Sequence, residues 1–225
     1  MEEKNNSNLS HFVTGDGSST VINARYQASY HSIKSAFSES MHVFINAGLV
    51  HYASLGHTKL RILEYGFGTG LNVILSIEEA IKRKLSLEYW SLDNTALPPE
   101  LSNALFPGEN LDADLFQQLH NCEWDTPLNF GSEITFRKCF CNFLDFSSDE
   151  KFDIIYYDAF SPKHQPELWT MEAMQSVLSH LRRDGLLVSY CASSAFKRNL
   201  KNLNCKVETL AGPPGKREMT RVWLK

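Results

Sequence analysis

A glycine-rich turn between a strand pattern and a helix pattern is the feature that most constrains this chain. The apolar run at residues 60–63 predicts a buried strand, and Gly66-Phe67-Gly68-Thr69-Gly70 follows it. Apolar residues then recur at helical spacing over residues 71–81. Glycine permits positive φ angles and close approach of a ligand, and the first N–H groups of the helix are free to bind it. The stretch therefore predicts a nucleotide-type site on a βα turn.

Two phosphate-binding patterns fit this turn poorly. A Walker loop needs Lys-Ser/Thr after the last glycine, where this chain has Leu71-Asn72, and the dinucleotide fingerprint Gly-x-Gly-x-x-Gly is one residue longer. The tighter Gly-x-Gly-x-Gly, with an acid at the strand end, resembles motif I of the class I S-adenosylmethionine (SAM) methyltransferases. An ordinary glycine-rich turn is the alternative. The resemblance implies that SAM is bound by Glu64, Gly66, Gly68, Thr69, Gly70 and Asn72.

Acidic and amide residues at the ends of later strands extend this hypothesis. Asp93 ends an apolar strand pattern 23 residues after Gly70, where an acid accepts hydrogen bonds from ribose hydroxyls in Rossmann-like sheets. Asn142 follows a third strand pattern, where related enzymes meet the adenine amino group. Asp158 follows a fourth, over residues 152–157, at the sheet edge beside the cofactor. The alternatives are a turn residue for Asp93 and a helix N-cap or pure cofactor contact for Asp158.

The pattern of elements predicts an α/β fold. We expect a Rossmann-like class I methyltransferase with a mostly parallel twisted sheet, helices on both faces and a C-terminal antiparallel hairpin. Ser38 is the expected N-cap of a helix over residues 38–53. Further helices are expected at 113–120, 171–181 and 196–203, and further strands at 186–191, 205–210 and 219–224. The expected organisation is a disordered tail at 1–11, a hairpin and helix extension at 12–58, and a SAM-dependent methyltransferase domain at 59–225.

Three motifs together resemble one family. Residues 65–72, the run Asp158-Ala159-Phe160-Ser161-Pro162 with Leu168-Trp169-Thr170, and Gly215-Lys216-Arg217-Glu218-Met219 are similar to the methyltransferase domain of the MnmC family. That resemblance implies methylation of the 5-aminomethyl group of (2-thio)uridine at the wobble position of tRNA. It implies that Asp158 is catalytic and orients the amine. Phe160 or Trp169 would stack on the uracil, with core packing as the alternative for Trp169.

The charge distribution agrees with an RNA partner. The net charge is −4, yet residues 195–225 carry eight basic and two acidic residues, which makes that segment +6 and the remainder −10. We expect Lys163, Lys197, Arg198, Lys216 and Arg217 to contact the anticodon stem-loop of tRNA. A solvated lysine-rich helix is the alternative. A SAM-dependent small-molecule N-methyltransferase, or a SAM-binding module without catalysis, would also carry the cofactor motifs.

Composition limits the remaining classes. No apolar window is long enough for a membrane span, and the polar N-terminus lacks a signal-peptide core. The five cysteines lack metal-site spacing, so we expect no metal and reduced thiols in a cytoplasmic protein. The FAD-dependent oxidase domain fused in MnmC is expected to be absent, as in a stand-alone form. The enzymes that install the aminomethyl group are the expected further partners.

Overall fold

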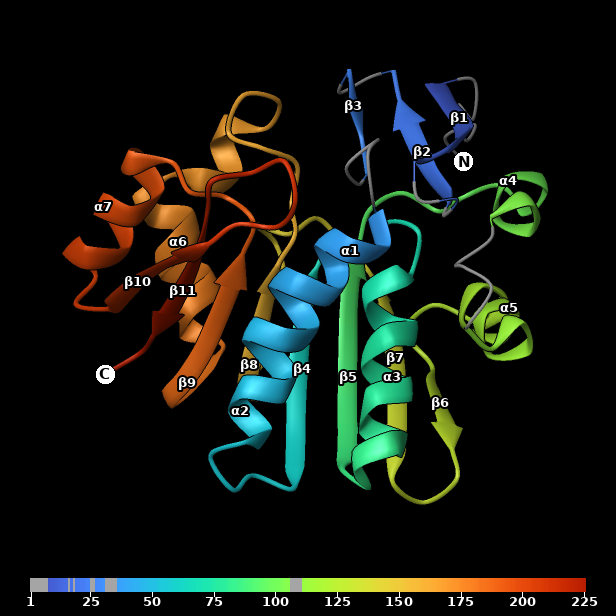
Figure 1. Cartoon of the computed structure of the whole chain (residues 1–225), viewed down its shortest axis with the longest axis horizontal. Helices are drawn as coiled ribbons and strands as arrows, with labels where there is room; N and C mark the ends of the chain where they lie inside the picture. Colours follow the sequence, from blue (N-terminus) through green and yellow to red (C-terminus); the bar gives the residue numbers. More distant parts are fainter. Residues whose placement is uncertain (1–7, 16, 18, 25–26, 31–35, 106–110) are drawn as a thin grey trace.

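The centre of the molecule is a mixed eight-stranded sheet (Figure 1). A computed structural model describes residues 8–15, 17, 19–24, 27–30, 36–105 and 111–225. The strand order is β10-β11-β9-β8-β4-β5-β7-β6. Neighbours run parallel from β9 through β7, and the two ends of the sheet are antiparallel. The strands are β4 (Lys59–Tyr65), β5 (Ser86–Asp93), β6 (Pro127–Phe130), β7 (Ile134–Phe140), β8 (Phe152–Tyr157), β9 (Leu181–Ser189), β10 (Lys206–Ala211) and β11 (Glu218–Trp223).

Helices cover both faces of the sheet, because its central strands are apolar on both sides. All six residues of β8 are buried. One core contains side chains of η2 (Met41–Val50), α3 (Leu71–Arg83) and α5 (Ala113–Asn121), and the other contains α6 (Met171–Ser179) and α7 (Ser194–Asn202). This arrangement confirms the expected class I methyltransferase fold, including the C-terminal hairpin of β10 and β11.

The N-terminal extension differs from the expectation in two places. The expected hairpin is present as β1 (Leu9–Val13) and β2 (Ser19–Asn23), joined by β3 (Ala28–Ser29), although Asp16 and Ser18 of its turn lie outside the described residues. β1 begins inside the stretch expected to be a disordered tail, because it pairs with β2 from Leu9 onward. Ser38 is not an N-cap, since α1 (Ala36–Ser40) already contains it and continues through η2 into α2 (His51–Ala53).

Other differences come from local geometry that patterning does not encode. The insertion at 94–132 holds α4 (Pro99–Ala104) and the edge strand β6 besides the expected α5. Residues 183–185, which precede the strand expected at 186–191, lie within β9, whose pairing with β8 jumps from Leu181 to Leu186. Asp184 takes φ +59° there and its N–H donates to the carbonyl of Leu224. The extra residues are therefore absorbed as an irregularity in the strand instead of a separate loop.

The topology predicts a crevice at the carboxyl end of β4. β4 has β5 on one side and β8 on the other, so the connections after these strands diverge at their carboxyl ends. Ligands of open α/β sheets bind at such a point. The small sheet of β1, β2 and β3 lies over this same end in Figure 1. None of the helices in the described ranges has the length and apolar character needed to cross a bilayer.

At the opposite end of the sheet, Asp153 links neighbouring strands through its side chain. This residue is 4% exposed, and its carboxylate accepts a hydrogen bond from Arg61 N at 2.7 Å and from Arg182 Nη1 at 2.6 Å. The three residues belong to β8, β4 and β9, so one carboxylate links three neighbouring strands. Arg61 also pairs with the exposed Glu150 at 2.7 Å.

Asp153→Ala should lower the free energy of unfolding by about 1–3 kcal/mol, because it leaves the partly buried N–H of Arg61 and the guanidinium of Arg182 without this acceptor. Glu150→Ala is the matched control, and removal of its exposed ion pair should cost less than about 1 kcal/mol. Urea unfolding of both variants tests the difference. Equal losses would contradict a special role for Asp153.

Candidate active site

The glycine-rich turn connects β4 to α3 under tight steric limits. Gly66 N and Phe67 N both donate to the carbonyl of Leu92 at 3.0 Å, which ties the turn to the end of β5. Gly66 has φ +112°, and a Cβ at this position would lie 2.9 Å from the carbonyl oxygen of Asp158. Only glycine meets both conditions. The turn therefore packs directly against the chain that leaves β8.

Asp93 braces this turn from the end of β5. Its carboxylate accepts hydrogen bonds from Gly68 N at 3.0 Å and from Thr95 N at 2.9 Å, one on each oxygen. Burial raises the pKa of Asp93 to about 6. Each carboxylate oxygen can accept a second hydrogen bond. Asp93 thus orders the turn and still presents acceptors to a ligand.

Glu64 and Asp158 are joined through one amide. Asn72 Nδ2, in the first turn of α3, donates to Glu64 Oε1 and to Asp158 Oδ2, each at 2.9 Å. Glu64 is fully buried, and its other oxygen accepts from Ser91 Oγ at 2.6 Å. Asn72 Oδ1 is buried without a hydrogen-bond partner among the described residues. Glu64 therefore lies behind the site and acts on it through Asn72.

The electrostatics of these carboxyl groups follow from their burial. Burial raises the pKa of Glu64 to about 8, against the effect of its two donors. The pKa of Asp158 also lies well above its usual value, first because of burial and then because of the neighbouring Glu64 and Glu39. Both groups therefore hold a proton more readily than exposed carboxyls do.

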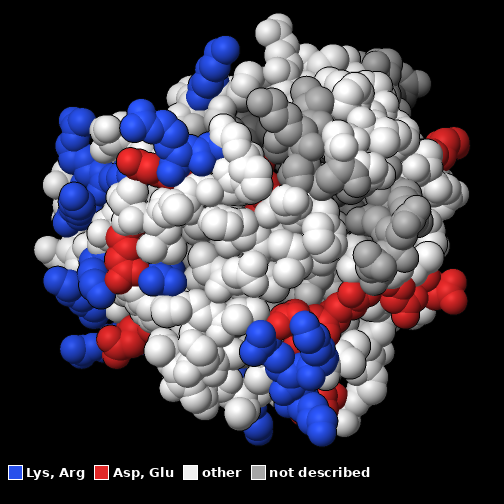
Figure 2. Space-filling view, in the orientation of Figure 1, with Lys and Arg blue, Asp and Glu red and all other residues white. Residues whose placement is uncertain are grey.

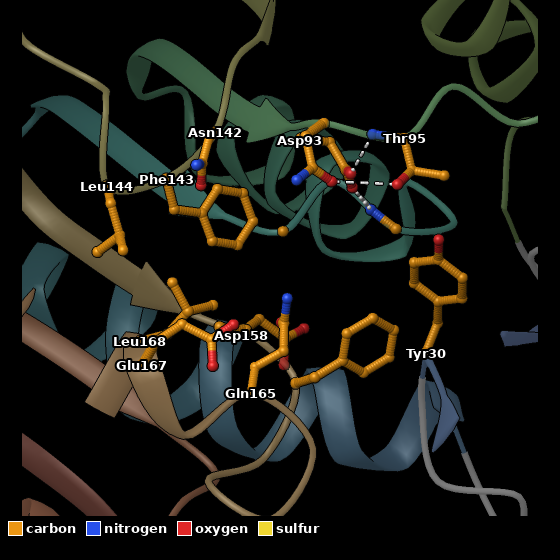
Figure 3. Close-up of a pocket in the computed structure, with 15 residues that line it drawn as sticks. Tyr30, Asp93, Thr95, Asn142, Phe143, Leu144, Asp158, Gln165, Glu167 and Leu168 are labelled. Carbon is orange, nitrogen blue, oxygen red and sulfur yellow. Dashed lines mark hydrogen bonds between the residues drawn. The ribbon is translucent and has the colours of Figure 1, made fainter. Parts of the chain in front are cut away.

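An open cavity of about 250 Å³ lies over the turn (Figure 3). Asp93 and Asn142 flank it on one side, Asp158 and Gln165 on the other, and Tyr30 closes one end. Five of the residues predicted to bind the cofactor line this cavity, namely Gly66, Gly68, Asp93, Asn142 and Asp158.

The remaining predicted cofactor residues lie behind the wall of the cavity. Thr69 is 2% exposed, and its carbonyl oxygen contacts His120 Nε2 at 3.0 Å. Gly70 is the N-cap of α3 with φ +75°. Together with Glu64 and Asn72, these residues shape the turn from inside, so their contribution to a ligand is indirect.

The two aromatic candidates for base stacking have different positions. Phe160 lines the cavity, and its ring centroid lies 5.3 Å from that of Tyr30. Trp169 is 5% exposed and packs edge-on against Tyr157 and Phe196 in the core. Core packing, the alternative for Trp169, is therefore what the structure has. Its Nε1 donates to the carbonyl of Phe160 at 2.8 Å, so Trp169 fixes the backbone of Phe160.

The basic residues divide into an exposed and a paired group. Lys and Arg gather over α7 and the β10–β11 hairpin, on the left of Figure 2. Lys163, Arg198 and Arg217 are exposed. Lys197 pairs with Glu218 at 2.7 Å, and Lys216 pairs with Glu39 at 2.5 Å beside Asp158. The structure therefore brings Lys216 to the site and leaves the exposed group around it.

Sequence patterns alone did not find several lining residues. Phe143 and Leu144 follow Asn142 on the wall, and Gln165, Glu167 and Leu168 come from the chain after β8. Leu144 is 44% exposed, and an apolar residue beside a predicted adenine contact was the available signal. Tyr30, from the N-terminal extension, also lines the cavity. His31 and Tyr26, near it in sequence, lie outside the described residues.

Known proteins match both the sequence and this fold. The family model described as S-adenosyl-L-methionine-dependent methyltransferase matches residues 130–225. The tRNA 5-methylaminomethyl-2-thiouridine biosynthesis bifunctional protein MnmC of Campylobacter hominis is 26% identical over 91% of this chain and 31% of its own length. The MnmC of Ralstonia nicotianae is 24% identical over 89% of this chain and 32% of its own.

A solved structure agrees with these relatives. The crystal structure of MnmC2 from Aquifex aeolicus superposes with a TM-score of 0.83 at 26% identity, covering 96% of this chain and 70% of that one. The chain is similar to MnmC. The resemblance expected from the three motifs is thereby confirmed, and the family model agrees with the expected cofactor. The chain spans about one third of the length of those curated relatives.

The buried Glu64 predicts a pH dependence of stability. The folded state retains the Glu64 proton up to about pH 8, whereas the unfolded chain loses it near 4.5. The stabilisation present below pH 4.5 is therefore lost as the pH rises toward 8. Glu64→Gln, which keeps the size and an acceptor, should show a flatter decline in the free energy of unfolding.

Urea unfolding of the cofactor-free protein at several pH values measures this. Asp93 and Asp158 also have raised pKa values but are present in both proteins, so the difference between the two profiles reports Glu64. Parallel profiles would contradict the assignment.

Proposed function

We propose that this chain transfers a methyl group from SAM to the amine of 5-aminomethyl-(2-thio)uridine at wobble position 34 of tRNA. The observation that carries the proposal is the place of Asp158. Its carboxylate is fixed by Asn72 and lines both the 250 Å³ cavity and a second, adjoining cavity. A group in this position can touch a cofactor and an acceptor together. The similarity to MnmC supports the choice of acceptor.

The residues around the first cavity fit SAM. Asp93 offers carboxylate oxygens to ribose hydroxyls, Asn142 offers an amide to the adenine, and Phe143 supplies an apolar wall. When bound, SAM supplies an electrophilic methyl group on a positively charged sulfur, and the N–C bond forms as the C–S bond breaks.

Asp158 would orient the acceptor amine and take its proton. A primary alkylamine is mostly protonated at neutral pH and must lose a proton before its lone pair can form a bond. The raised pKa of the buried Asp158 lies nearer to that of an alkylammonium than the pKa of an exposed aspartate does. Proton transfer to Asp158 is therefore less uphill than in water, and the hydrogen bond directs the lone pair. Holding both groups at reacting distance supplies much of the remaining acceleration.

Substitutions of Asp158 and Asp93 should affect different steps, the first methyl transfer and the second SAM binding. Asp158→Ala should cut single-turnover methylation of aminomethyl-containing tRNA by about 10²–10⁴ and change SAM affinity much less. Asp93→Ala should weaken SAM binding by about 1–3 kcal/mol, because the turn and the ribose lose an acceptor. Calorimetry with SAM and product analysis of labelled tRNA measure the two effects.

Asp158→Asn refines this test. If orientation by a hydrogen bond dominates, Asn should retain more activity than Ala. If proton acceptance dominates, both variants should be similarly inactive, and raising the pH should partly rescue them by supplying neutral amine. Turnover near the wild-type rate in Asp158→Ala would remove Asp158 from the mechanism. Methylation of small amines with no preference for tRNA would favour the small-molecule enzyme, and SAM binding without any turnover would favour the binding module.

The tRNA would lie on the exposed basic residues around the site. The double variant Arg198→Ala with Arg217→Ala should lower the log–log salt slope of tRNA binding by about 1.4–1.8, at 0.7–0.9 for each phosphate that is no longer neutralised. The control is Lys59→Ala with Lys82→Ala, which removes the same charge away from the site, because Lys59 opens β4 at the end opposite the turn. Titration of labelled tRNA at several salt concentrations measures the slopes, and equal slopes in the two double variants would place the tRNA elsewhere.

This function implies a cellular setting for the protein. It would act in the cytoplasm on mature anticodon stem-loops, after the enzymes that install the aminomethyl group. Among the proposed contacts, Lys163 and Lys197 extend the basic surface along the chain after β8 and along α7.

A further inference from the structure

A second cavity of about 340 Å³ adjoins the first and shares Asp158, Phe160 and Tyr30 with it. Glu39, Tyr190 and Lys216 are among the further residues of its wall. The shared residues make it the natural position for the methyl acceptor. Glu39 comes from α1, Tyr190 from the chain after β9, and Lys216 from the turn of the C-terminal hairpin, so all three lie outside the cofactor motifs.

Glu39 is held in a defined orientation on this wall. It lies in α1, its side chain is 12% exposed, and its Oε1 accepts a hydrogen bond from Lys216 Nζ at 2.5 Å. Lys216 Nζ in turn lies 4.3 Å from the centroid of the Tyr190 ring, and the Tyr190 hydroxyl donates to the carbonyl of Ala159 at 2.8 Å. The carboxylate is thus fixed by contacts that lead back to the residue after Asp158.

The charges around the cavity favour a cation. Glu39 and Asp158 supply two carboxyl groups, Lys216 supplies one ammonium, and His164 adds an imidazole among the described lining residues. The two carboxyl groups are close enough that Glu39 helps to raise the pKa of Asp158. A primary amine entering here can donate hydrogen bonds to both carboxyl groups, whereas the ammonium of Lys216, which could bind an anionic substituent, is already paired with Glu39. Phenylalanine and tyrosine rings on the shared wall suit a flat base.

We infer that Glu39 is a specificity-determining residue that, together with Asp158, selects an acceptor base whose substituent ends in a primary amine. The inference rests on the proposed function, because it concerns the acceptor of that reaction. Lys216 positions Glu39 and leaves its second oxygen for the substrate. Hydroxymethyl and carboxymethyl substituents lack the donors or the charge that this pair of carboxylates binds.

Binding without turnover tests the inference. Two synthetic anticodon stem-loops are compared, one with 5-aminomethyluridine and one with 5-hydroxymethyluridine at position 34, on protein saturated with S-adenosylhomocysteine. The wild type should prefer the amine, and Glu39→Gln should lower the ratio of the two dissociation constants by about tenfold or more, because a charge-assisted hydrogen bond is removed. Glu39→Asp, which retains the charge, should keep more of the preference than Glu39→Gln.

The matched control is Glu208→Gln. Glu208 pairs with Arg221 at 2.8 Å on the same C-terminal hairpin but does not line the cavity, so its variant should keep the wild-type ratio. Unchanged affinity for S-adenosylhomocysteine shows that each variant is folded. A wild type that methylates the aminomethyl stem-loop while Glu39→Gln keeps the full preference overturns the role of Glu39. A wild type that does not methylate it overturns the proposed function as well.

Discussion

The side-chain amide of Asn72 lies between two carboxyl groups that are removed from water, and the site depends on this contact. One Nδ2 group donates to both Glu64, near the end of β4, and Asp158, directly after the adjacent strand β8. Burial raises the pKa of both carboxyl groups, and the nearby Glu64 adds to the rise for Asp158. The shared donor fixes the direction of Asp158. It also links that direction to α3, the helix that the glycine turn begins.

The residues of this site that directly follow strand patterns could be predicted from the sequence. Gly66, Gly68, Asp93 and Asp158 each follow an apolar strand pattern, and parallel strands bring their carboxyl ends to one edge. That these residues lie close together therefore follows from the strand patterns that precede them. The resemblance to MnmC added the acceptor, which no strand pattern encodes.

The part that depends on packing between distant segments was not accessible. Lys216 reads as one more residue of a basic loop, and its contact with Glu39 spans 177 positions of the chain. Trp169 beside a proline-bounded loop suggests a base platform, but it lies in the core of α6 and α7. Glu64 fits a cofactor motif, yet Ser91 and Asn72 occupy both of its oxygens behind the wall. In each case the partner is set by tertiary structure, and a local pattern cannot name it.

The order of strands at one end of the sheet has a consequence for how the protein is made. β11 pairs with β9 on one side and β10 on the other, so a strand that is synthesised after β10 must enter between the two. Until residues 218–223 have left the ribosome, β9 is an open edge with unpaired backbone groups, a surface that invites pairing with other chains. The hairpin that closes this edge also carries Lys216 to Glu39. Protection from aggregation and completion of the acceptor cavity therefore occur in the same late step of folding.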